Sequence, residues 1–451
     1  MAVPTASAES NLTIRLRKLA HRIGRPLFAV LLAIIAGGIV IMITSPGSLL
    51  DRFNQTIVAY QALFTGAFGN AQNFSFTLTT VTPLILASLS VAIAYRAGLF
   101  NIGAAGQLAV GAMTAGIIGF EAKNWPGWLL IPTMILCSML AGAVWGGIVG
   151  VLKAWRGAHE VVTTIMLNWI AFYVTDYLIT GPFNAPHQAN QTDSLPPQAT
   201  LPHIAGFYNQ TLGTFLPKIA QPDQYLVDVG LFFSLFALVV YWFITSRTTF
   251  GYEIRVIGQN PKAAKYAGIS IKWNFFAVMA IAGAFAGLAG ALRLMGQFPY
   301  QLIGSTFSID PTGFDAIGVA LLGQTTAIGM LFGALLFGGL RQGGTFMQLT
   351  ANVPGDLVYI IQALVLFSIA SEFLPAIQRA WSKRSLFRRR AAPTTTAATI
   401  AVVDLAENRN GNGAGPQEAA SAMKSVGATT DGGSTTPQPS SESSSTQIEE
   451  D

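Results

Sequence analysis

Charged residues are scarce in this sequence. Asp, Glu, Lys and Arg make up 10% of the 451 residues, whereas 51% are hydrophobic, and the mean hydropathy is +0.49. Soluble globular proteins carry about 25% charged residues. Three uncharged runs (26–50, 97–120 and 273–292) are each long enough to cross a hydrocarbon core of about 30 Å as a helix. The composition therefore predicts an all-α polytopic integral membrane protein.

Cysteine and histidine are also rare. The single cysteine, Cys137, excludes an intramolecular disulfide and a cysteine-based metal site. The four histidines, His21, His159, His187 and His203, are too scattered along the chain to indicate a metal cluster.

The sequence also lacks the motifs of an enzyme or a self-contained motor. No lysine follows a glycine, so a P-loop, whose lysine and backbone amides hold nucleotide phosphates, is excluded. Asp176, Asp310, Asp315 and Asp356 lie near predicted outer ends of spans rather than at mid-membrane, which disfavours a proton relay, although carbonyls alone can hold Na⁺. No Ser/His/Asp set or paired carboxylates indicate hydrolysis. We expect no catalysis, no metal and no cofactor bound by this chain.

What is present is a series of apolar segments. The segments 99–120 and 310–326, the third and eighth of the predicted spans, are glycine-rich, and we expect them to be broken or partly re-entrant. Segment 52–69 is interpreted as an interfacial helix, and the first span as an anchor rather than a signal peptide, since it is too long and lacks a convincing cleavage site. We predict about ten spans, at 27–45, 76–95, 99–120, 128–151, 161–180, 227–245, 273–293, 310–326, 327–346 and 354–371.

The basic residues indicate the orientation, because Lys and Arg concentrate on the cytoplasmic side of membrane proteins. With ten spans and a cytoplasmic N-terminus, the outer segments hold only Arg52, Lys123 and Lys218. The inner segments hold nineteen: Arg15, Arg17, Lys18, Arg22, Arg25, Arg96, Lys153, Arg156, Arg247, Arg255, Lys262, Lys265, Lys272, Arg379, Lys383, Arg384, Arg388, Arg389 and Arg390. We therefore predict both termini in the cytoplasm and a multi-pass protein of the bacterial plasma membrane. Nucleic acid is not needed to explain the basic pI.

The predicted organisation has three parts: a basic cytoplasmic N-terminus (1–26), a transmembrane permease domain (27–375) and a cytoplasmic tail (376–451). The tail is basic at first, and from residue 391 on it is rich in Ser, Thr, Gly, Pro and Ala without any aromatic residue, which predicts disorder. The outer loop 181–226 is either a lid or docking surface or a plain solvated connection.

The inner loop 246–272 is basic and contains the sequence GYEIRVIGQNPKAAKYAGIS. Its KAAKYAG stretch predicts a short helix at the membrane surface, and Gly258 and Pro261 would turn the chain into it. Attraction to anionic lipid would explain the charges, but lipid requires no Gly-x-Asn-Pro turn. We therefore favour a docking element for a cytoplasmic partner.

Three segments carry a family resemblance: YRAGLFNIGAAGQ (95–107), HEVVTTIMLNWIA (159–171) and GYEIRVIGQNPKAAKYAGISIKW (251–273). Together they resemble the permease subunit of bacterial ABC importers for nucleosides and simple sugars, a family that includes the ribose and branched-chain amino acid permeases. The resemblance covers roughly residues 27–375 and is nearest to nucleoside permeases. One departure is Ala105, where many relatives carry Glu.

This resemblance implies the partners and the mechanism. ATP and Mg²⁺ would be bound on a separate cytoplasmic ABC ATPase, a second permease subunit would complete the pathway as a heterodimer, and an extracellular substrate-binding lipoprotein would deliver the cargo. The loop around Gly251–Ile269 would be the coupling helix. The residues assigned to coupling are Gly251, Glu253, Arg255, Gly258, Asn260, Pro261, Ala263, Ala264, Tyr266 and Gly268.

Several polar residues inside predicted spans are candidates for the substrate pathway. Thr164, Asn168 and Thr175 share one helix face by their spacing, and Asn168 is the first candidate to bond a nucleoside. The alternative is that these groups, like Asn101 and Gln107, only bond neighbouring helices. The remaining candidates lie near outer ends: Gln297 at the end of the seventh span, and Arg341, for which we expect an inward ion pair with an outer-end Asp. Arg293 is explained by snorkelling to the interface.

Alternatives to a nucleoside importer remain. Within the same class the substrate would be a simple sugar or a branched-chain amino acid. From another class, an ion-coupled secondary transporter would need no ATPase, and co-purification separates the two. A non-transporting scaffold is disfavoured because no sizeable soluble domain is present.

Overall fold

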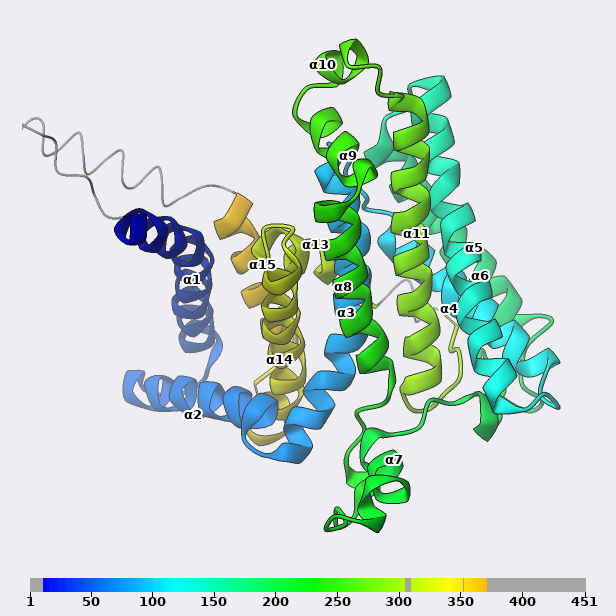
Figure 1. The fold of residues 1–451 in the computed structure, drawn as a ribbon. Helices are drawn as coiled ribbons and strands as arrows, with labels where there is room; N and C mark the ends of the chain where they lie inside the picture. Colours follow the sequence, from blue (N-terminus) through cyan, green and yellow to red (C-terminus); the bar gives the residue numbers. More distant parts are fainter. Residues whose placement is uncertain (1–10, 305–309, 352, 371–451) are drawn as a thin grey trace, which may run out of the picture. The chain divides into compact units, whose positions relative to one another are not determined.

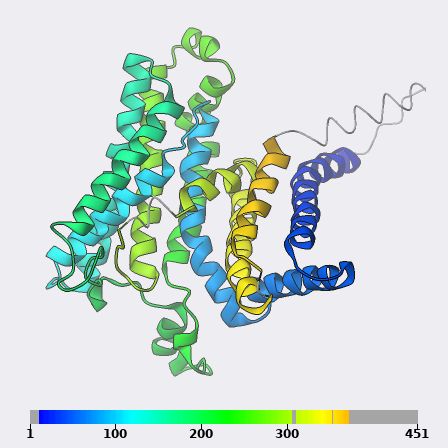
Figure 2. The same cartoon turned by 180° about the vertical axis from the view of Figure 1, so that it is seen from behind.

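The computed structural model describes residues 11–304, 310–351 and 353–370, and these residues are helical apart from loops and two isolated β-bridges. Figures 1 and 2 show the helices from opposite sides. The long helices are α1 (Asn11–Thr44), α2 (Leu49–Phe68), α3 (Ala71–Arg96), α4 (Ala104–Glu121), α5 (Gly127–Arg156), α6 (Glu160–Thr180), α8 (Gly230–Arg247), α11 (Ile271–Gly296), α14 (Ala327–Ala351) and α15 (Asp356–Ala370). The shorter ones are α7 (Ile204–Gln210), α9 (Thr249–Gln259), α10 (Pro261–Tyr266) and α13 (Thr312–Leu322), with 3₁₀ turns at Pro197–Ala199, Leu212–Thr214 and Pro222–Gln224.

Each of the ten predicted spans contains a helix, but the described helices differ in their ability to cross a membrane. Six are long and apolar enough: Leu27–Thr44, Ala71–Arg96, Gly127–Arg156, Glu160–Thr180, Gly230–Arg247 and Ile271–Gly296. The protein is thus a helical, multi-pass membrane protein, while the number ten stays a prediction. α13 has 11 residues and rises only about 16 Å, so the eighth segment is not a regular spanning helix, as its glycines predicted.

The predicted third span begins later than expected. Residues 99–103 are not helical, and α4 starts at Ala104. The reason is local: Gly98 has a φ of +74°, a left-handed conformation that glycine adopts readily and that ends the preceding helix. The first span differs in the other direction, because α1 extends back to Asn11, into the segment predicted as the basic N-terminus.

The helix α11 lies at the centre of one half of the fold and packs against α5, α4 and α3. Small residues allow this packing. A Cβ placed on Gly283 would collide with the carbonyl oxygen of Gly142, and one on Gly290 with the carbonyl oxygen of Leu108. Helices associate in lipid through close backbone approach of this kind, because lipid tails are as apolar as the helices and no hydrophobic effect drives the helices together.

The other half is built on α14, which packs against α2 and α3, while α13 packs against α3 and α1 against α15. α2 runs across the direction of α14 in both views (Figures 1 and 2). A capping box between Ser48 and Asp51 starts it. The predicted segment 52–69 is therefore a helix, and its position at the interface stays a prediction.

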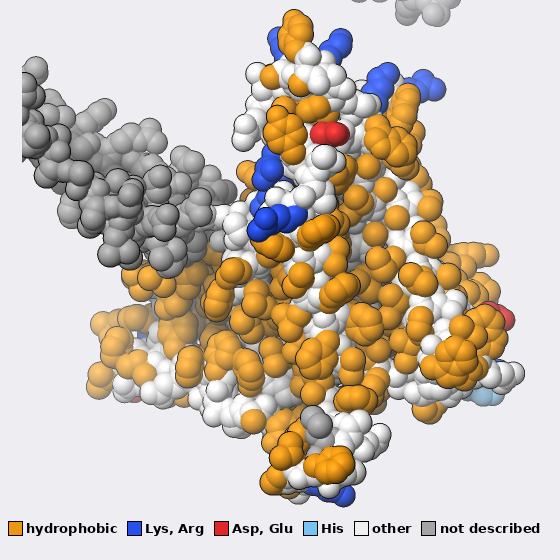
Figure 3. All heavy atoms as spheres, viewed as in Figure 1, with side chains coloured by type: hydrophobic (Ala, Val, Ile, Leu, Met, Phe, Trp, Pro, Cys, Tyr) orange, Lys and Arg blue, Asp and Glu red, His pale blue; other side chains and the backbone are white. Residues whose placement is uncertain are grey.

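Charge and apolar surface are separated along the helices. Figure 3 shows Lys and Arg side chains gathered at the end that carries α9 and α10, while hydrophobic side chains cover the flanks of the long helices. This distribution fits a bundle whose sides face lipid.

Candidate functional site

The inner loop 246–272 forms a helical hairpin, which contains the predicted short helix and a second helix before it. α9 ends at Gln259, and α10 starts at Pro261 (Figure 1). Asn260 separates them: its Oδ1 accepts hydrogen bonds from the backbone N–H groups of Lys262 and Ala263, both at 3.1 Å. Pro261 at the first helical position is pre-set for a helix and lacks the N–H that would otherwise stay unpaired. The Gly-x-Asn-Pro sequence is thus a helix cap and not only a turn.

α10 presents most of its side chains to the outside. Tyr266 is 95% exposed, and Lys262, Ala263 and Lys265 are also exposed, whereas Ala264 is buried. Gly268, with a φ of +77°, ends the helix. An exposed aromatic ring next to two exposed lysines on a capped helix is a surface that a partner can bind.

α9 is fixed more firmly to the bundle. Glu253 Oε2 accepts a hydrogen bond from Asn274 Nδ2 of α11 at 2.8 Å. A Cβ on Gly251 would collide with the carbonyl oxygen of Ile244 in α8. Arg255 is exposed. The ten residues assigned to coupling therefore lie along one hairpin, where all but Gly251, Glu253 and Ala264 are exposed. Their role in coupling stays a prediction.

Asn101 and Gln107 belong to a buried polar network at the start of α4. Asn101 Nδ2 donates to Ser90 Oγ at 2.9 Å and to Gln107 Oε1 at 3.0 Å, and Asn101 Oδ1 accepts from the Gly103 N–H at 3.0 Å. All three polar side chains are 0% exposed. The network joins α3 to the irregular 97–103 segment, so these residues bond neighbouring elements, and contact with a substrate stays a prediction.

Thr164, Asn168 and Thr175 lie on one buried face of α6, as their spacing predicted. Asn168 bridges two backbone groups of another segment: its Oδ1 accepts from the Gly106 N–H at 2.9 Å, and its Nδ2 donates to the Ile102 carbonyl at 3.0 Å. The two threonines donate to carbonyls of α6 itself. Asn168 therefore caps α4 from a different helix, a role that Gly103, at the N-cap, has no side chain to fill.

Two arginines converge on Asp310. Arg341 of α14 pairs with it at 3.1 Å and donates to Thr312 Oγ1 at 2.9 Å, which confirms the expected inward ion pair. Arg293 of α11 also pairs with Asp310. The snorkelling interpretation of Arg293 is therefore wrong, because the chain after α11 folds back and brings the Asp310 carboxylate against the Arg293 side chain. The Asp310 side chain is 5% exposed, so this bridge ties α11, α14 and the start of α13 together away from water.

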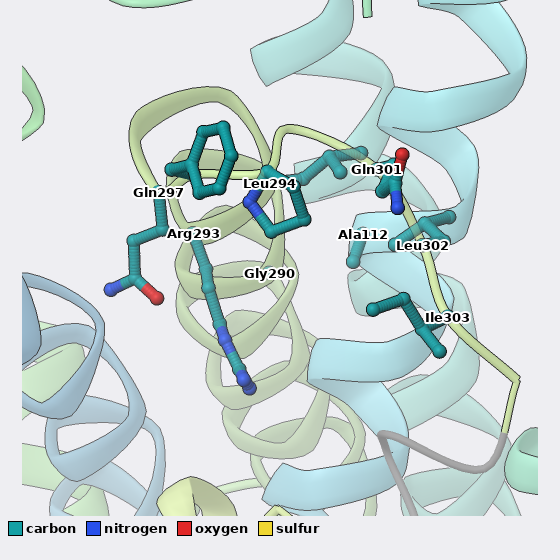
Figure 4. A pocket seen from close by; sticks show the side chains of 10 residues that line it. Ala112, Gly290, Arg293, Leu294, Gln297, Gln301, Leu302 and Ile303 are labelled. Carbon is teal, nitrogen blue, oxygen red and sulfur yellow. The ribbon is translucent and has the colours of Figure 1, made fainter. Parts of the chain in front are cut away.

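A small pocket lies beside this bridge. Its volume is about 110 Å³, below the roughly 300–1,000 Å³ of typical small-molecule sites. Figure 4 shows that α11 contributes Arg293 and Leu294, the segment after it Leu302 and Ile303, and α4 Ala112. Gln297 also lines the pocket, but its Nε2 donates to the Thr79 carbonyl of α3 at 3.0 Å.

The predicted outer loop 181–226 is anchored to the segment that follows α11. The Leu195 N–H donates to the Tyr300 carbonyl at 2.8 Å, and His203 Nε2 lies 3.0 Å from the Tyr300 hydroxyl. His203 also forms an isolated β-bridge with Asp228, which lies two residues before α8. The Oδ1 atom of Asp228 accepts a hydrogen bond from the Gly230 N–H at 2.6 Å. Burial raises the pKa of Asp228 to about 6. The loop is thus fixed at both ends, and its use as a lid or docking surface stays a prediction.

A comparison with protein families decides the identity. The family model described as the permease component of the branched-chain amino acid transport system matches residues 73–370. The chain belongs to this permease family. It is a permease component of an ABC transporter in the plasma membrane. Such components transport a substrate and are not enzymes.

Three similar permeases cover most of the chain. It is 37% identical over 348 residues to the guanosine ABC transporter permease NupP of Bacillus subtilis (77% of this chain, 93% of NupP). It is 35% identical over 350 residues to the nucleoside ABC transporter permease NupB of Lactococcus lactis (77% and 91%), and 34% identical over 356 residues to the glucose ABC transporter permease TsgB13 of Haloferax volcanii (78% and 88%). A second guanosine permease of B. subtilis, NupQ, is 29% identical over 309 residues (65% and 88%). No solved structure matches this chain.

Sequence reasoning missed two polar contacts of this permease. Arg96 was counted only as a positive-inside charge, yet its Nη2 donates to the Thr325 carbonyl at 2.7 Å. Asp310 was noted only as an outer-end acid, and no local pattern links it to Arg293. The available signal was the position of Arg96 and Arg293 at the ends of apolar segments, because a charge there needs a partner or water.

Proposed function

We propose that this permease forms part of the translocation pathway of a nucleoside importer and that a separate cytoplasmic ABC ATPase docks on α10. The observation that carries the docking surface is the exposure of Tyr266, Lys262 and Lys265 on a helix capped by Asn260. The predicted orientation, with this end in the cytoplasm, follows from the basic residues gathered there (Figure 3). ATP and Mg²⁺ would then be held by the ATPase.

Nucleosides are the proposed cargo because the permeases NupP and NupB, named for guanosine and nucleosides, match at 37% and 35% identity. A simple sugar is the second candidate, since TsgB13, named for glucose, matches at 34% over a similar length. A branched-chain amino acid is disfavoured because the polar candidates of the pathway suit a polar nucleoside or sugar better than an apolar side chain.

A second permease subunit is part of the proposal. The pocket of about 110 Å³ beside Arg293 is too small for a nucleoside, so the passage would be completed between two permeases. The presence of two guanosine permeases similar to this chain in one organism, NupP and NupQ, supports a heterodimer. An extracellular lipoprotein would deliver the substrate.

The test is co-purification and uptake in the native host. A tag on this chain should recover an ATPase and a second permease, and right-side-out vesicles loaded with ATP should accumulate labelled guanosine. Unlabelled guanosine should compete, whereas glucose and leucine should not. Reversing the charge of α10 with Lys262→Glu and Lys265→Glu should release the ATPase. Accumulation driven by an ion gradient without any ATPase would reject the proposal, and competition by glucose would favour the sugar.

A further inference from the structure

Arg96, the last residue of α3, contacts the turn between α13 and α14. Its Nη2 donates to the Thr325 carbonyl at 2.7 Å. The same oxygen accepts a second hydrogen bond, at 2.8 Å, from the hydroxyl of Tyr241 in α8. The Arg96 guanidinium lies 5.5 Å from the centre of the Tyr241 ring, within the range of a cation–π contact. Two helices, α3 and α8, thus meet this turn at one backbone oxygen.

The turn that they hold has an unusual backbone. Gln324 and Thr325 have φ values of 50° and 52°, a left-handed conformation that residues with a Cβ adopt rarely and that persists only where the surroundings enforce it. The turn is also tightly packed, since a Cβ on Gly323 would lie 2.5 Å from the Met330 N. The two donors to the Thr325 carbonyl are therefore part of what keeps the turn in this shape.

Arg96 is in contact with α9 as well. A Cβ placed on Gly258, in the last turn of α9, would collide with the carbonyl oxygen of Arg96 and lie 3.1 Å from the Gly98 N. No side chain separates the two backbones. A displacement of the α9–α10 hairpin toward α3 cannot be absorbed there and must move the end of α3.

We propose that Arg96 is a positioning residue that transmits movement of the α9–α10 hairpin to the α13–α14 turn. This inference rests on the proposed docking of an ATPase on α10. The route runs from Gly258 to the backbone of Arg96, and from its guanidinium to Thr325. α13 also holds Thr312, which donates to Asp310 Oδ1, and α14 holds Arg341, which pairs with Asp310, so a shift of the turn would reach the Asp310 bridge.

The test compares two arginines at the same end of the bundle. Arg96→Gln removes the donor to Thr325 and the cation–π contact. Arg247→Gln is the matched control, because Arg247 ends α8 and its guanidinium stacks on Trp242, 5.2 Å from the centre of the ring. Both variants lose one basic charge at the same predicted side. Tyr241→Phe removes only the second donor to the Thr325 carbonyl and should have a smaller effect.

The measurement is guanosine accumulated per ATP hydrolysed by the complex in vesicles. Arg96→Gln should retain the ATPase and hydrolyse ATP near the wild-type rate but transport roughly tenfold less per ATP, as expected when one hydrogen bond of a charged group no longer links two elements. Arg247→Gln should match the wild type. An unchanged ratio in Arg96→Gln, or loss of the ATPase from the complex, overturns the relay. A wild-type complex that holds no ATPase instead overturns the proposed function.

Hydrogen exchange separates a relay from a merely structural contact. In the wild type, trapping the complex with vanadate should change exchange both in residues 251–266 and in residues 323–326. In Arg96→Gln the change in 251–266 should persist and the change in 323–326 should disappear. If the turn responds equally in both proteins, Arg96 transmits nothing.

Discussion

Asn168 offers a direct way to separate a packing role from a substrate role. Its amide satisfies the Gly106 N–H and the Ile102 carbonyl, and the residue is 3% exposed. Asn168→Leu keeps nearly the same bulk and removes both hydrogen bonds. If the amide caps α4, this variant should unfold more readily, and the permease that remains folded should keep its affinity for guanosine.

The size of the effect follows from the two bonds. Interhelical hydrogen bonds in membrane proteins contribute about 0.6 kcal/mol on average and up to about 1.7 kcal/mol, and a buried backbone group left without a partner costs about 1–3 kcal/mol. The Gly106 N–H is one of the first N–H groups of α4, which no carbonyl within the helix can satisfy. A loss of roughly 1–4 kcal/mol is therefore expected for Asn168→Leu.

The assay is the apparent melting temperature of the detergent-solubilised chain, followed by guanosine uptake normalised to folded protein. Thr175→Val is the matched control on the same face of α6, because its hydroxyl bonds only carbonyls of its own helix, and it should melt within a degree or two of the wild type. Unchanged stability of Asn168→Leu together with a raised KM for guanosine would refute the capping argument and restore Asn168 as a substrate contact.

Three further outcomes follow from the structure. Asp310→Asn leaves two partly buried arginines without a carboxylate and should cost up to about 3–5 kcal/mol, seen as loss of folded protein. Arg341→Gln leaves Asp310 one partner and should reduce uptake in a chain that still assembles; unchanged uptake would remove Arg341 from the pathway. Burial raises the pKa of Asp228 from 3.8 to about 6, so its contribution to stability is complete below pH 3.8 and is lost as the pH rises through about 6. The melting temperature of the wild type should therefore rise relative to that of Asp228→Asn between pH 7 and pH 5, and parallel curves would contradict this. Gly283→Ala, whose Cβ would collide with a carbonyl oxygen of α5, should destabilise by about 1–3 kcal/mol, whereas Gly206→Ala in α7, with nothing within 4 Å, should be neutral.

The positions of the helices could be predicted from the sequence because uncharged length is a local property. Each predicted span contains a helix, and the face of α6 that carries Thr164, Asn168 and Thr175 is buried as its spacing indicated. Asn260 and Pro261 likewise predict the start of α10 at their own position in the sequence. In these cases the residues that decide the structure are neighbours in sequence.

The partners of the polar groups could not be predicted because they lie far apart in sequence. Arg96 and Thr325 are 229 positions apart, and nothing near Arg96 distinguishes it from the other basic residues at that end. Arg293 was assigned to the interface because a long side chain near a helix end usually snorkels, and only the fold brings Asp310 to it. Orientation rules average over charges and cannot identify the individual arginines that turn inward.

Three polar side chains of this permease bond backbone groups where helices break. Asn168 caps the start of α4, and Arg96 and Tyr241 hold the carbonyl of the turn between α13 and α14. In lipid a helix end exposes backbone groups that no water can satisfy, so a broken helix is possible only where side chains from other helices supply the bonds. Helix breaks are also the places where a bundle can change shape without stretching a continuous helix. The two interpretations of these residues, packing and transport, therefore make different predictions only for variants such as Asn168→Leu and Arg96→Gln, in which stability and transport are measured on the same protein.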